Sequence, residues 1–434
     1  MKTHRTSPSL LFAAMLVAAP FHADAARVDY QVDLGLERND NVLMSSTDPA
    51  DSSALRAGFG FVVTEETSAV QANFSGRFEY WNYVDGPQPS NAFEASLSGR
   101  LNWFIVPETF SFTVEDSLEM RPIDRFVPDT ADNRQRVNVL SLGPNLQFDW
   151  GQATRSLLEL RWIDSRAENG DQLESQRLSA ALHAVRDLDS TSSLSLNLRG
   201  QDVDYTHDIT ARDHHRYDGY LSYQKQLTRL GFGLDAGNSW VDYADGSSGS
   251  YPLLRARIEW AVSARSVLSL GAARQLTDST DSAIAGITNA SSVPDRLSTI
   301  SSTVNSSIYE EERIDLGWTY RNDRIRLTLA PYYRDVDFLD IDASDENRRG
   351  AVMLLSYRLA PTWDVGTFVD VARSDFRNPD LRTEDKRYGL SVDKTWSRHW
   401  STALDYVHYR RDMDGPSGDS RQNIWLLTVT YRNR

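Results

Sequence analysis

Three groups of side chains in the sequence are of types that could take part in chemistry. The first contains His207, His214 and His215, with Asp213 beside the second of them. A histidine next to a carboxylate is part of the arrangement that a hydrolase needs, but such an enzyme also needs a nucleophile in reach. The spacing assigns no nucleophile, and the sequence has no glycine-rich phosphate loop, zinc-ligand spacing or nucleophile elbow. We therefore expect exposed loop histidines, no enzyme activity and no cofactor.

The second group is acidic and lies between residues 335 and 346. It consists of Asp335, Asp337, Asp340, Asp342, Asp345 and Glu346. Oxygen ligands can hold Ca²⁺, but the ordered ligand spacing and the glycine of an EF-hand loop are missing. The pattern favours a solvated acidic loop, or diffuse divalent-ion bridging to lipopolysaccharide, and no specific metal site.

The third group is a set of charged residues that alternate with apolar ones. Its members are Arg77, Glu79, Arg100, Glu159, Arg161, Arg255, Arg257, Glu259, Arg313, Asp315 and Asp405. The elements that carry them decide what they can do, and alternation with a period of two indicates β-strands with one apolar and one polar face. From Val70 to Tyr80 one parity is apolar and the other is polar, and residues 93–103 repeat this pattern.

About 20 such segments follow one another, each roughly 10 residues long, and they are typical of a transmembrane β-barrel. Short and long connections alternate, as they do in outer-membrane barrels with tight periplasmic turns and longer outer loops. The sequence predicts an all-β fold, an antiparallel up-and-down barrel of about 20 strands with both ends periplasmic. An 18-strand barrel is the alternative, because residues 191–241 alternate less cleanly where Asp202 and Asp204 interrupt the apolar parity.

The two ends and the composition set the compartment. Lys2 and Arg5 precede an apolar run at residues 10–19, and Ala23-Asp24-Ala25 fits a signal-peptidase site. We therefore expect a signal peptide at residues 1–25, a barrel domain at 26–434 and a place in the bacterial outer membrane. The chain carries a formal net charge of −15, which argues against nucleic-acid binding, and it has no cysteine.

Aromatic residues lie towards the ends of many predicted strands. Trp and Tyr prefer the boundary between membrane and water, so these positions predict two girdles of interfacial rings. The residues concerned are Tyr80, Trp81, Tyr83, Trp103, Trp150, Trp162, Trp240, Trp260, Trp318, Tyr320, Trp396, Trp400 and Trp425.

Stretches near both ends of the chain resemble a known group of proteins. Residues 34–45, which contain Asn39-Asp40-Asn41-Val42, are similar to the first-strand signature of the outer-membrane β-barrel porins associated with exopolysaccharide loci. Residues 388–391 and 404–412, with Gln422-Asn423 before the last strand, resemble the closing strands of that group. The resemblance implies an outer-membrane channel or accessory in exopolysaccharide or capsule export. It also implies a polysaccharide chain and periplasmic export components as partners, and it transfers no catalytic residue.

Two other functions stay open at this point. The charged set of alternate positions also fits a general diffusion porin for small solutes, because mixed charges in a hydrated lumen tune selectivity. A barrel-embedded hydrolase is the third and least favoured function. Residues 276–308 form the longest predicted connection, and a loop of this length could fold inward and narrow the pore or could be a flexible outer loop. The expected surroundings are outer-membrane lipid and lipopolysaccharide.

Overall fold

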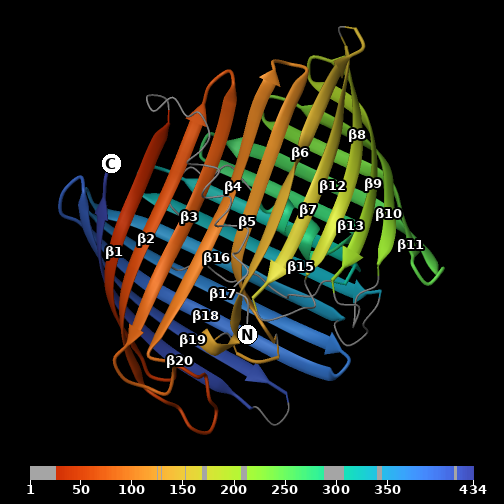
Figure 1. The fold of residues 1–434 in the computed structure, drawn as a ribbon. Helices are drawn as coiled ribbons and strands as arrows, with labels where there is room; N and C mark the ends of the chain where they lie inside the picture. The colour runs from red at the N-terminus through yellow and green to blue at the C-terminus, as the bar shows by residue number, and fades with distance from the viewer. Residues whose placement is uncertain are drawn as a thin grey trace, which may run out of the picture.

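The computed structural model contains 20 antiparallel strands that form one sheet (Figure 1). It describes residues 26–124, 126–128, 130–151, 153–168, 174–206, 213–287, 307–339, 345–414 and 418–434. The predicted signal peptide lies outside these residues, so that expectation stays a prediction. The strands are β1 (Arg27–Asn39), β2 (Ser52–Glu66), β3 (Val70–Tyr83), β4 (Asn91–Val106), β5 (Phe110–Pro122), β6 (Arg134–Asp149), β7 (Thr154–Ala167), β8 (Ser175–Asp189), β9 (Ser192–Tyr205), β10 (His214–Gln226), β11 (Leu230–Tyr243), β12 (Ser248–Ser263), β13 (Ser266–Thr277), β14 (Tyr309–Arg321), β15 (Ile325–Phe338), β16 (Glu346–Ala360), β17 (Trp363–Arg377), β18 (Asp380–Thr395), β19 (Trp400–Met413) and β20 (Ser420–Arg432).

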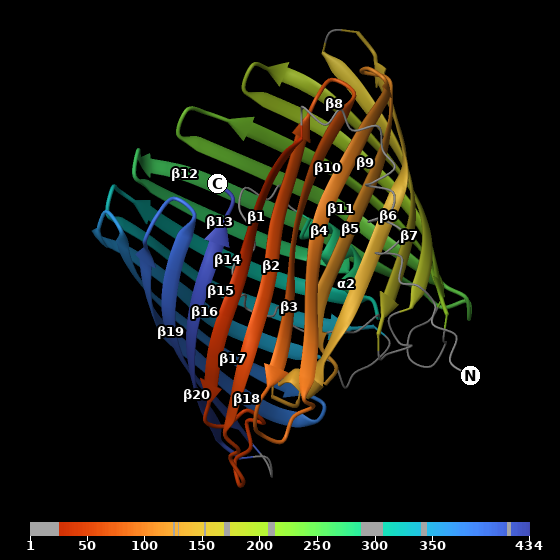
Figure 2. The ribbon, with the colours of Figure 1, turned by 60° about the vertical axis from the view of Figure 1, so that its left-hand side comes forward.

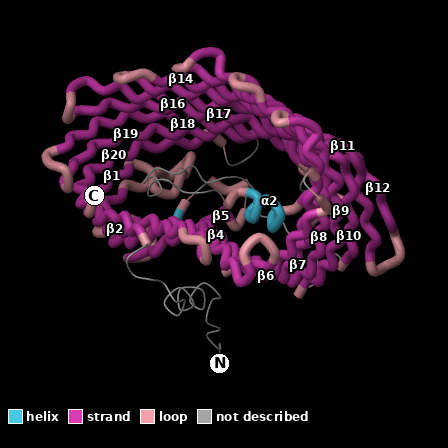
Figure 3. Tube along the Cα trace, turned by 90° about the horizontal axis from the view of Figure 1, so that it is seen from above, coloured by secondary structure: helices cyan, strands magenta, loops and turns pink. Residues whose placement is uncertain are grey.

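The sheet closes on itself to form a barrel. Each strand pairs with its neighbours along the chain, and β1 pairs with β20 from Gln31↔Arg432 to Asn39↔Ile424. Closure satisfies the backbone hydrogen bonds of both edge strands, which a lipid environment requires. The view from above shows the closed ring and the short helix α2 (Ser279–Ala285) inside it (Figure 3). The predicted fold class and the count of 20 strands are confirmed.

The outer face of the barrel is apolar, as the alternation predicts. Leu34, Leu36 and Leu427 at the seam between β1 and β20 are exposed, and so are Leu390 and Leu404 on β18 and β19. Residues of the other parity are polar and turn towards the lumen, such as Asp33 on β1. No helix among the described residues is long and apolar enough to cross a membrane.

The connections fix the orientation of the barrel. Turns such as 67–69, 190–191 and 361–362 lie at one end, together with the start of β1 and the end of β20. Longer connections, such as 40–51 and 84–90, lie at the other end (Figure 2). Because outer-membrane barrels have short periplasmic turns, the end with the long connections is the outer one.

The aromatic prediction is right for most positions but wrong for two. Trp103, Trp260 and Trp400 are exposed towards the periplasmic end, and Trp240 and Trp425 are exposed towards the outer end. Trp81 and Tyr83, however, share the inward parity of Arg77 and stack on each other with ring centroids 6.3 Å apart. The guanidinium carbon of the inward Arg56 lies 4.8 Å from the Trp81 ring centroid, so this ring packs on a lumen cation and does not border the lipid.

Asp202 and Asp204 have a simple explanation in the structure. They continue the outward row of Leu194, Leu196 and Leu198 towards the outer end of β9. Asp202 lies 2.8 Å from His215 of β10, and both side chains are exposed. The strand extends past the apolar band into water, so the interrupted parity marks its solvated end and not a missing strand.

The seam between β1 and β20 brings together the stretches that carry the family resemblance. Asp40 accepts hydrogen bonds from the backbone N–H of Asn423 at 2.7 Å and from its side-chain amide at 2.6 Å. Asn39 donates to Gln422 at 3.0 Å. Asn41 donates to the carbonyl oxygen of Arg421 at 2.8 Å. The first and last strands are therefore tied together at their outer ends by side chains as well as by the sheet.

Candidate functional site

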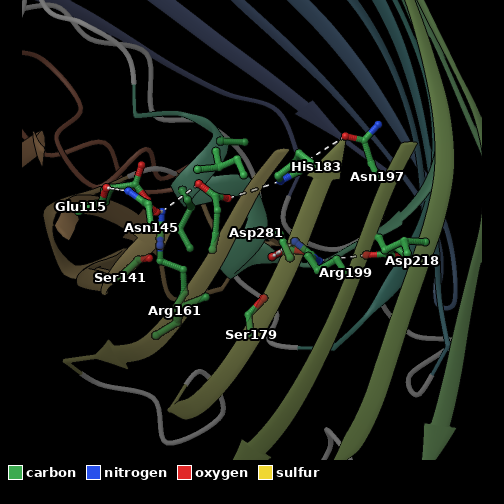
Figure 4. A pocket seen from close by; sticks show the side chains of 18 of the residues that line it. Glu115, Ser141, Asn145, Arg161, Ser179, His183, Asn197, Arg199, Asp218 and Asp281 are labelled. Carbon is green, nitrogen blue, oxygen red and sulfur yellow. Dashed lines mark hydrogen bonds and ion pairs between the residues drawn. The ribbon is translucent and has the colours of Figure 1, made fainter. Parts of the chain in front are cut away.

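A polar cavity of about 1000 Å³ opens inside the barrel, between α2 and the walls formed by β4 to β14. Figure 4 shows side chains from neighbouring strands pointing into this space, with Asp281 of α2 reaching Arg199 of β9. We take this cavity as the candidate functional site, because it is a space inside the barrel that is lined by polar and charged side chains.

The residues just before α2 hold it against the wall. Asp278 caps the helix, since its carboxylate accepts from the backbone N–H of Thr280 at 2.8 Å and of Asp281 at 2.9 Å. The same carboxylate lies 2.6 Å from the guanidinium of Arg177 on β8, and the two side chains are only 2% and 1% exposed. Arg177 also donates to the hydroxyl of Thr280 at 3.0 Å. One buried arginine thus fixes the first turn of the helix.

Asp281 makes a second set of ion pairs. Its carboxylate lies 2.7 Å from Arg199 of β9 and 3.0 Å from Arg216 of β10, and Asp218 lies 3.0 Å from each of these arginines. Burial alone raises the pKa of Asp281, but the charges of Arg199 and Arg216 outweigh it and hold the pKa below its usual range. Asp281 is therefore a carboxylate at neutral pH. We call Arg177, Arg199, Arg216, Asp278 and Asp281 the α2 anchor.

Apolar packing completes the contact of α2 with the wall. Ala283 is buried in one cluster with Val139 of β6 and Ile163 of β7, and Ile284 packs against this cluster. Residues 278–287 of the long connection therefore lie inside the barrel, which is one of the two arrangements left open by the sequence, whereas residues 276 and 277 belong to β13. Residues 288–306 lie outside the described residues.

Polar side chains form the neighbouring part of the wall. Glu159 of β7 lies 3.0 Å from Arg161, which also donates to Asn145 at 2.6 Å. His183 of β8 lies 3.5 Å from Glu159 and 2.8 Å from the side-chain oxygen of Asn197. These contacts fix the rotamers of side chains that border the cavity.

The cavity brings together most of the residues that alternation selects. Arg100, Glu159, Arg161, Arg255, Arg257 and Arg313 line it. Arg100 lies 2.6 Å from Glu115, Arg313 lies 2.8 Å from Asp315, and Arg255 donates to Gln275 at 2.7 Å. Arg257 makes no ion pair within the described part of the chain. Glu259 is exposed, on the same parity of β12 and nearer the periplasmic end.

The remaining three predicted residues lie away from the cavity. Arg77 and Glu79 belong to a buried network near the seam, in which Arg77 lies 2.7 Å from Asp33 and pairs with Glu79, and Arg56 also pairs with Glu79. Thr430 of β20 donates to Asp33 at 2.6 Å, so the network links β20, β1, β2 and β3. Asp405 is buried on β19. The side chains of Arg77, Glu79 and Asp405 are therefore buried in the barrel wall and do not line the cavity.

The histidine and acidic groups separate in the structure. His214 is buried between the rings of Tyr205 and Tyr243, whereas the neighbouring His215 pairs with Asp202 on the outer surface. Asp335 and Asp337 both pair with Arg377 of β17. No group of three or more potential metal ligands occurs among the residues that the structure describes. His207, Asp340 and Asp342 lie outside them.

Sequence reasoning missed the α2 anchor. Arg177, Arg199 and Arg216 have the inward parity of predicted strands, so the alternation rule alone could have selected them. Their importance comes from their ion pairs with Asp278 and Asp281, which lie far away in the chain. Arg177 and Asp278 are 101 residues apart, and Arg216 and Asp281 are 65 residues apart. No local signal in the sequence connects these positions.

Comparison with known proteins yields structural likeness only. No family model matches the chain, and no curated protein matches it. A mutant of the ferric enterobactin receptor PfeA from Pseudomonas aeruginosa aligns with a TM-score of 0.47 and 10% identity over 94% of this chain and 81% of that one. The FrpB iron transporter of Neisseria meningitidis gives 0.45 and 10%, over 97% and 83%. OccK2 (OpdF) of Pseudomonas aeruginosa gives 0.40 and 10%, over 94% and 98%. Scores this low say nothing about a solute or a mechanism.

The class of the protein follows from its own architecture. A closed sheet of 20 antiparallel strands, with an apolar outer face bordered by aromatic rings and a polar lumen, is an outer-membrane β-barrel. The protein resides in the bacterial outer membrane, where a closed barrel satisfies every strand edge.

Proposed function

We propose that the protein is a passive channel for small hydrophilic solutes, in which α2 narrows the lumen. The observation that carries the proposal is the docking of α2 inside the barrel by the α2 anchor, beside a polar cavity of about 1000 Å³. Barrels of 16–18 strands already leave an aqueous channel, and one of 20 strands is wider still. A segment held inside such a barrel reduces the size of the solute that can pass.

The wall chemistry supports hydrophilic solutes. Arginines and carboxylates alternate around the cavity, and most of them form ion pairs with one another, as Arg100 does with Glu115 and Arg161 with Glu159. Paired charges of both signs present hydrogen-bonding groups to water and polar solutes without a large net field of one sign. A barrel alone has no energy source, so movement through it follows the concentration gradient.

Single-channel conductance of the refolded protein in a planar bilayer tests the proposal. We expect discrete, steady conductance steps in KCl, and we expect neutral sugars to pass in a liposome-swelling assay with a cut-off set by size. A sample that is folded by heat-modifiable gel mobility and yet conducts no ions would refute the proposal.

A conduit or accessory role in exopolysaccharide export is the second candidate. One observation favours it: Asp40 and Asn423, from two of the stretches that resemble the exopolysaccharide-associated porins, are hydrogen-bonded to each other. Tyr406 and His408, from the similar stretch at residues 404–412, also lie 2.8 Å from the side-chain oxygen of Asn423. The similarity therefore falls on residues that form one structural unit.

Two measurements separate the candidates. In the export role, an in-frame deletion reduces surface polysaccharide, and oligosaccharide interrupts the single-channel current. In the diffusion role, the deletion slows the uptake of small solutes and leaves surface polysaccharide unchanged. The export role also requires a polysaccharide chain and periplasmic export components as partners.

A further inference from the structure

On four adjacent strands the outward row changes from apolar or aromatic side chains to a cation as it approaches the outer end of the barrel. On β18 the outward row reads Leu390, Tyr388, Lys386 and then Glu384. An apolar residue, an aromatic ring, a cation and an anion thus follow one another away from the lipid band. The outward parity is certain because Leu390 and Tyr388 are exposed large side chains on a closed barrel.

The neighbouring strands also place a cation directly beyond their apolar or aromatic residues, and the next outward residue is an acid on β17 and β19 and an amide on β16. The rows are Met353, Ala351, Arg349 and Asn347 on β16, Val369, Val371, Arg373 and Asp375 on β17, and Tyr406, His408, Arg410 and Asp412 on β19. Arg349 is in register with Arg373, and Lys386 is in register with Arg410. We call Arg349, Arg373, Lys386 and Arg410 the rim cluster.

The acidic neighbours of the rim cluster lie on its water side. Asp375 is 3.2 Å from Arg373, Glu384 is 3.0 Å from Lys386, and Asp412 is 2.6 Å from Arg410. Each of these acids is two residues farther from the apolar band than its partner. Among the described residues, the acidic partner of Arg349 is Asp375, at 4.0 Å, and the Arg349 side chain is 56% exposed. The cluster therefore presents positive charge at the boundary between the apolar band and water.

The rest of the described outer rim has a different order. On β9, β11, β14 and β15 the first charged residue beyond the apolar row is an acid, namely Asp202, Asp242, Glu312 and Asp335 respectively. Arg421 of β20 is also exposed, has the outward parity of Trp425 and lies in register with Arg410. Arg38, Arg136 and Arg274 are outward cations on other strands, and they pair with Asp51, Glu168 and Glu310 respectively. Outward cations that lie in register on paired strands are therefore concentrated on β16 to β20 of the described rim.

We propose that the rim cluster binds the phosphate groups of lipid A, the membrane anchor of lipopolysaccharide, in the outer leaflet. Phosphates lie at the boundary between acyl chains and water, which is the level of these four cations, and arginine forms bidentate contacts with phosphate oxygens. The stacked rings of Tyr388 and His408, with centroids 4.8 Å apart, and the tilted rings of Tyr406 and Trp425, with centroids 4.7 Å apart, lie nearer the apolar band than the cations and fit the acyl-chain boundary. The outer end is the one with the long connections, so the leaflet is the outer one.

Lipid retention by matched variants tests this proposal. The variant R349Q/K386Q/R410Q removes three cations of the rim cluster. The control R38Q/R136Q/R274Q removes three isolated cations of similar exposure from the same rim. Each protein, folded by heat-modifiable mobility, is mixed with phosphatidylcholine vesicles that contain bisphosphoryl lipid A, dephosphorylated lipid A or phosphatidylglycerol, and bound lipid is measured after purification.

We expect the wild type and the control to retain bisphosphoryl lipid A, and the rim variant to bind it on the order of 100-fold more weakly. Dephosphorylated lipid A should bind weakly to all three proteins. Equal loss in the control, or no loss in the rim variant, would overturn the site. Equal retention of phosphatidylglycerol and lipid A would overturn the assignment to lipid A. Channel conductance is measured separately, so failure of the lipid site leaves the proposed channel function untouched.

Discussion

Replacing Asp278 by asparagine should release α2 from the barrel wall. The D278N substitution keeps the helix cap, because asparagine is as good an N-cap residue as aspartate. The change removes only the negative charge beside Arg177, and both side chains are almost fully buried. An uncompensated buried charge of this kind costs about 3–5 kcal/mol.

The size of this penalty decides the outcome. Burial of an isoleucine side chain contributes about 1.5–3 kcal/mol, and the apolar contact of α2 consists mainly of Ala283 and the partly buried Ile284. Of the two ion pairs of Asp281, the one with Arg199 is partly exposed and contributes less than a fully buried pair, whereas Arg216 is buried. The loss at Arg177 therefore exceeds the apolar term, and we expect the helix to leave the wall for a large fraction of the time.

A cysteine reporter measures the release, because the chain has no cysteine of its own. Ala283 is 4% exposed, so a maleimide should label A283C slowly in an otherwise unchanged barrel and at least 100-fold faster beside D278N. A244C, in an exposed outer connection, gives the rate of an accessible thiol. D242N, a change of an exposed acid on β11, is the matched control and should leave the rate unchanged. Mean single-channel conductance should rise in D278N. Slow labelling together with unchanged conductance would refute the role of the Arg177–Asp278 pair.

Three further predictions concern other parts of the molecule. D40A removes both hydrogen bonds to Asn423 and should lower the free energy of unfolding by about 1–2 kcal/mol. The temperature at which the folded band disappears in heat-modifiable electrophoresis should therefore fall. The control D48A, at an exposed site, should leave that temperature unchanged. Because the pKa of Asp281 is lowered, its contribution to the docking of α2 is fully present above the usual aspartate pKa of about 3.9, and it is lost only as the pH falls through the lowered pKa. Single-channel conductance should therefore be the same at pH 7 and pH 4.5. A rise in conductance within that interval would contradict the role of Asp281. R257Q removes a cavity-lining cation that has no ion pair among the described residues. The reversal potential in a KCl gradient should therefore shift towards cation selectivity. An unchanged reversal potential would place Arg257 outside the permeation path.

Alternation predicts the barrel because the side-chain period of a strand is independent of its partners. The inward parity of Arg100, Glu159 and Arg161 follows from this rule, and the structure places all three on the cavity. The prediction for Trp81 is wrong because it relies on residue type, which suggests a girdle, although parity places the ring inside the barrel beside Arg56. The position of α2 depends on Arg177, which lies far away in the chain, so no local pattern distinguishes an inward from an outward segment there.

Arginines have different roles on the two faces of this barrel because their surroundings differ. Arg177 and Arg216 are almost fully buried, and each binds an acid that the chain supplies from the connection after β13. Breaking such a pair is costly, so these arginines can fix the position of a segment. Lys386 and Arg410 are about half exposed, and surface ion pairs contribute only about 0–1 kcal/mol. A phosphate that meets several such cations at once can compete with their weak acidic partners. Residue type and parity assign the face of the barrel, whereas burial decides whether a cation holds the protein's own chain or is available to a ligand.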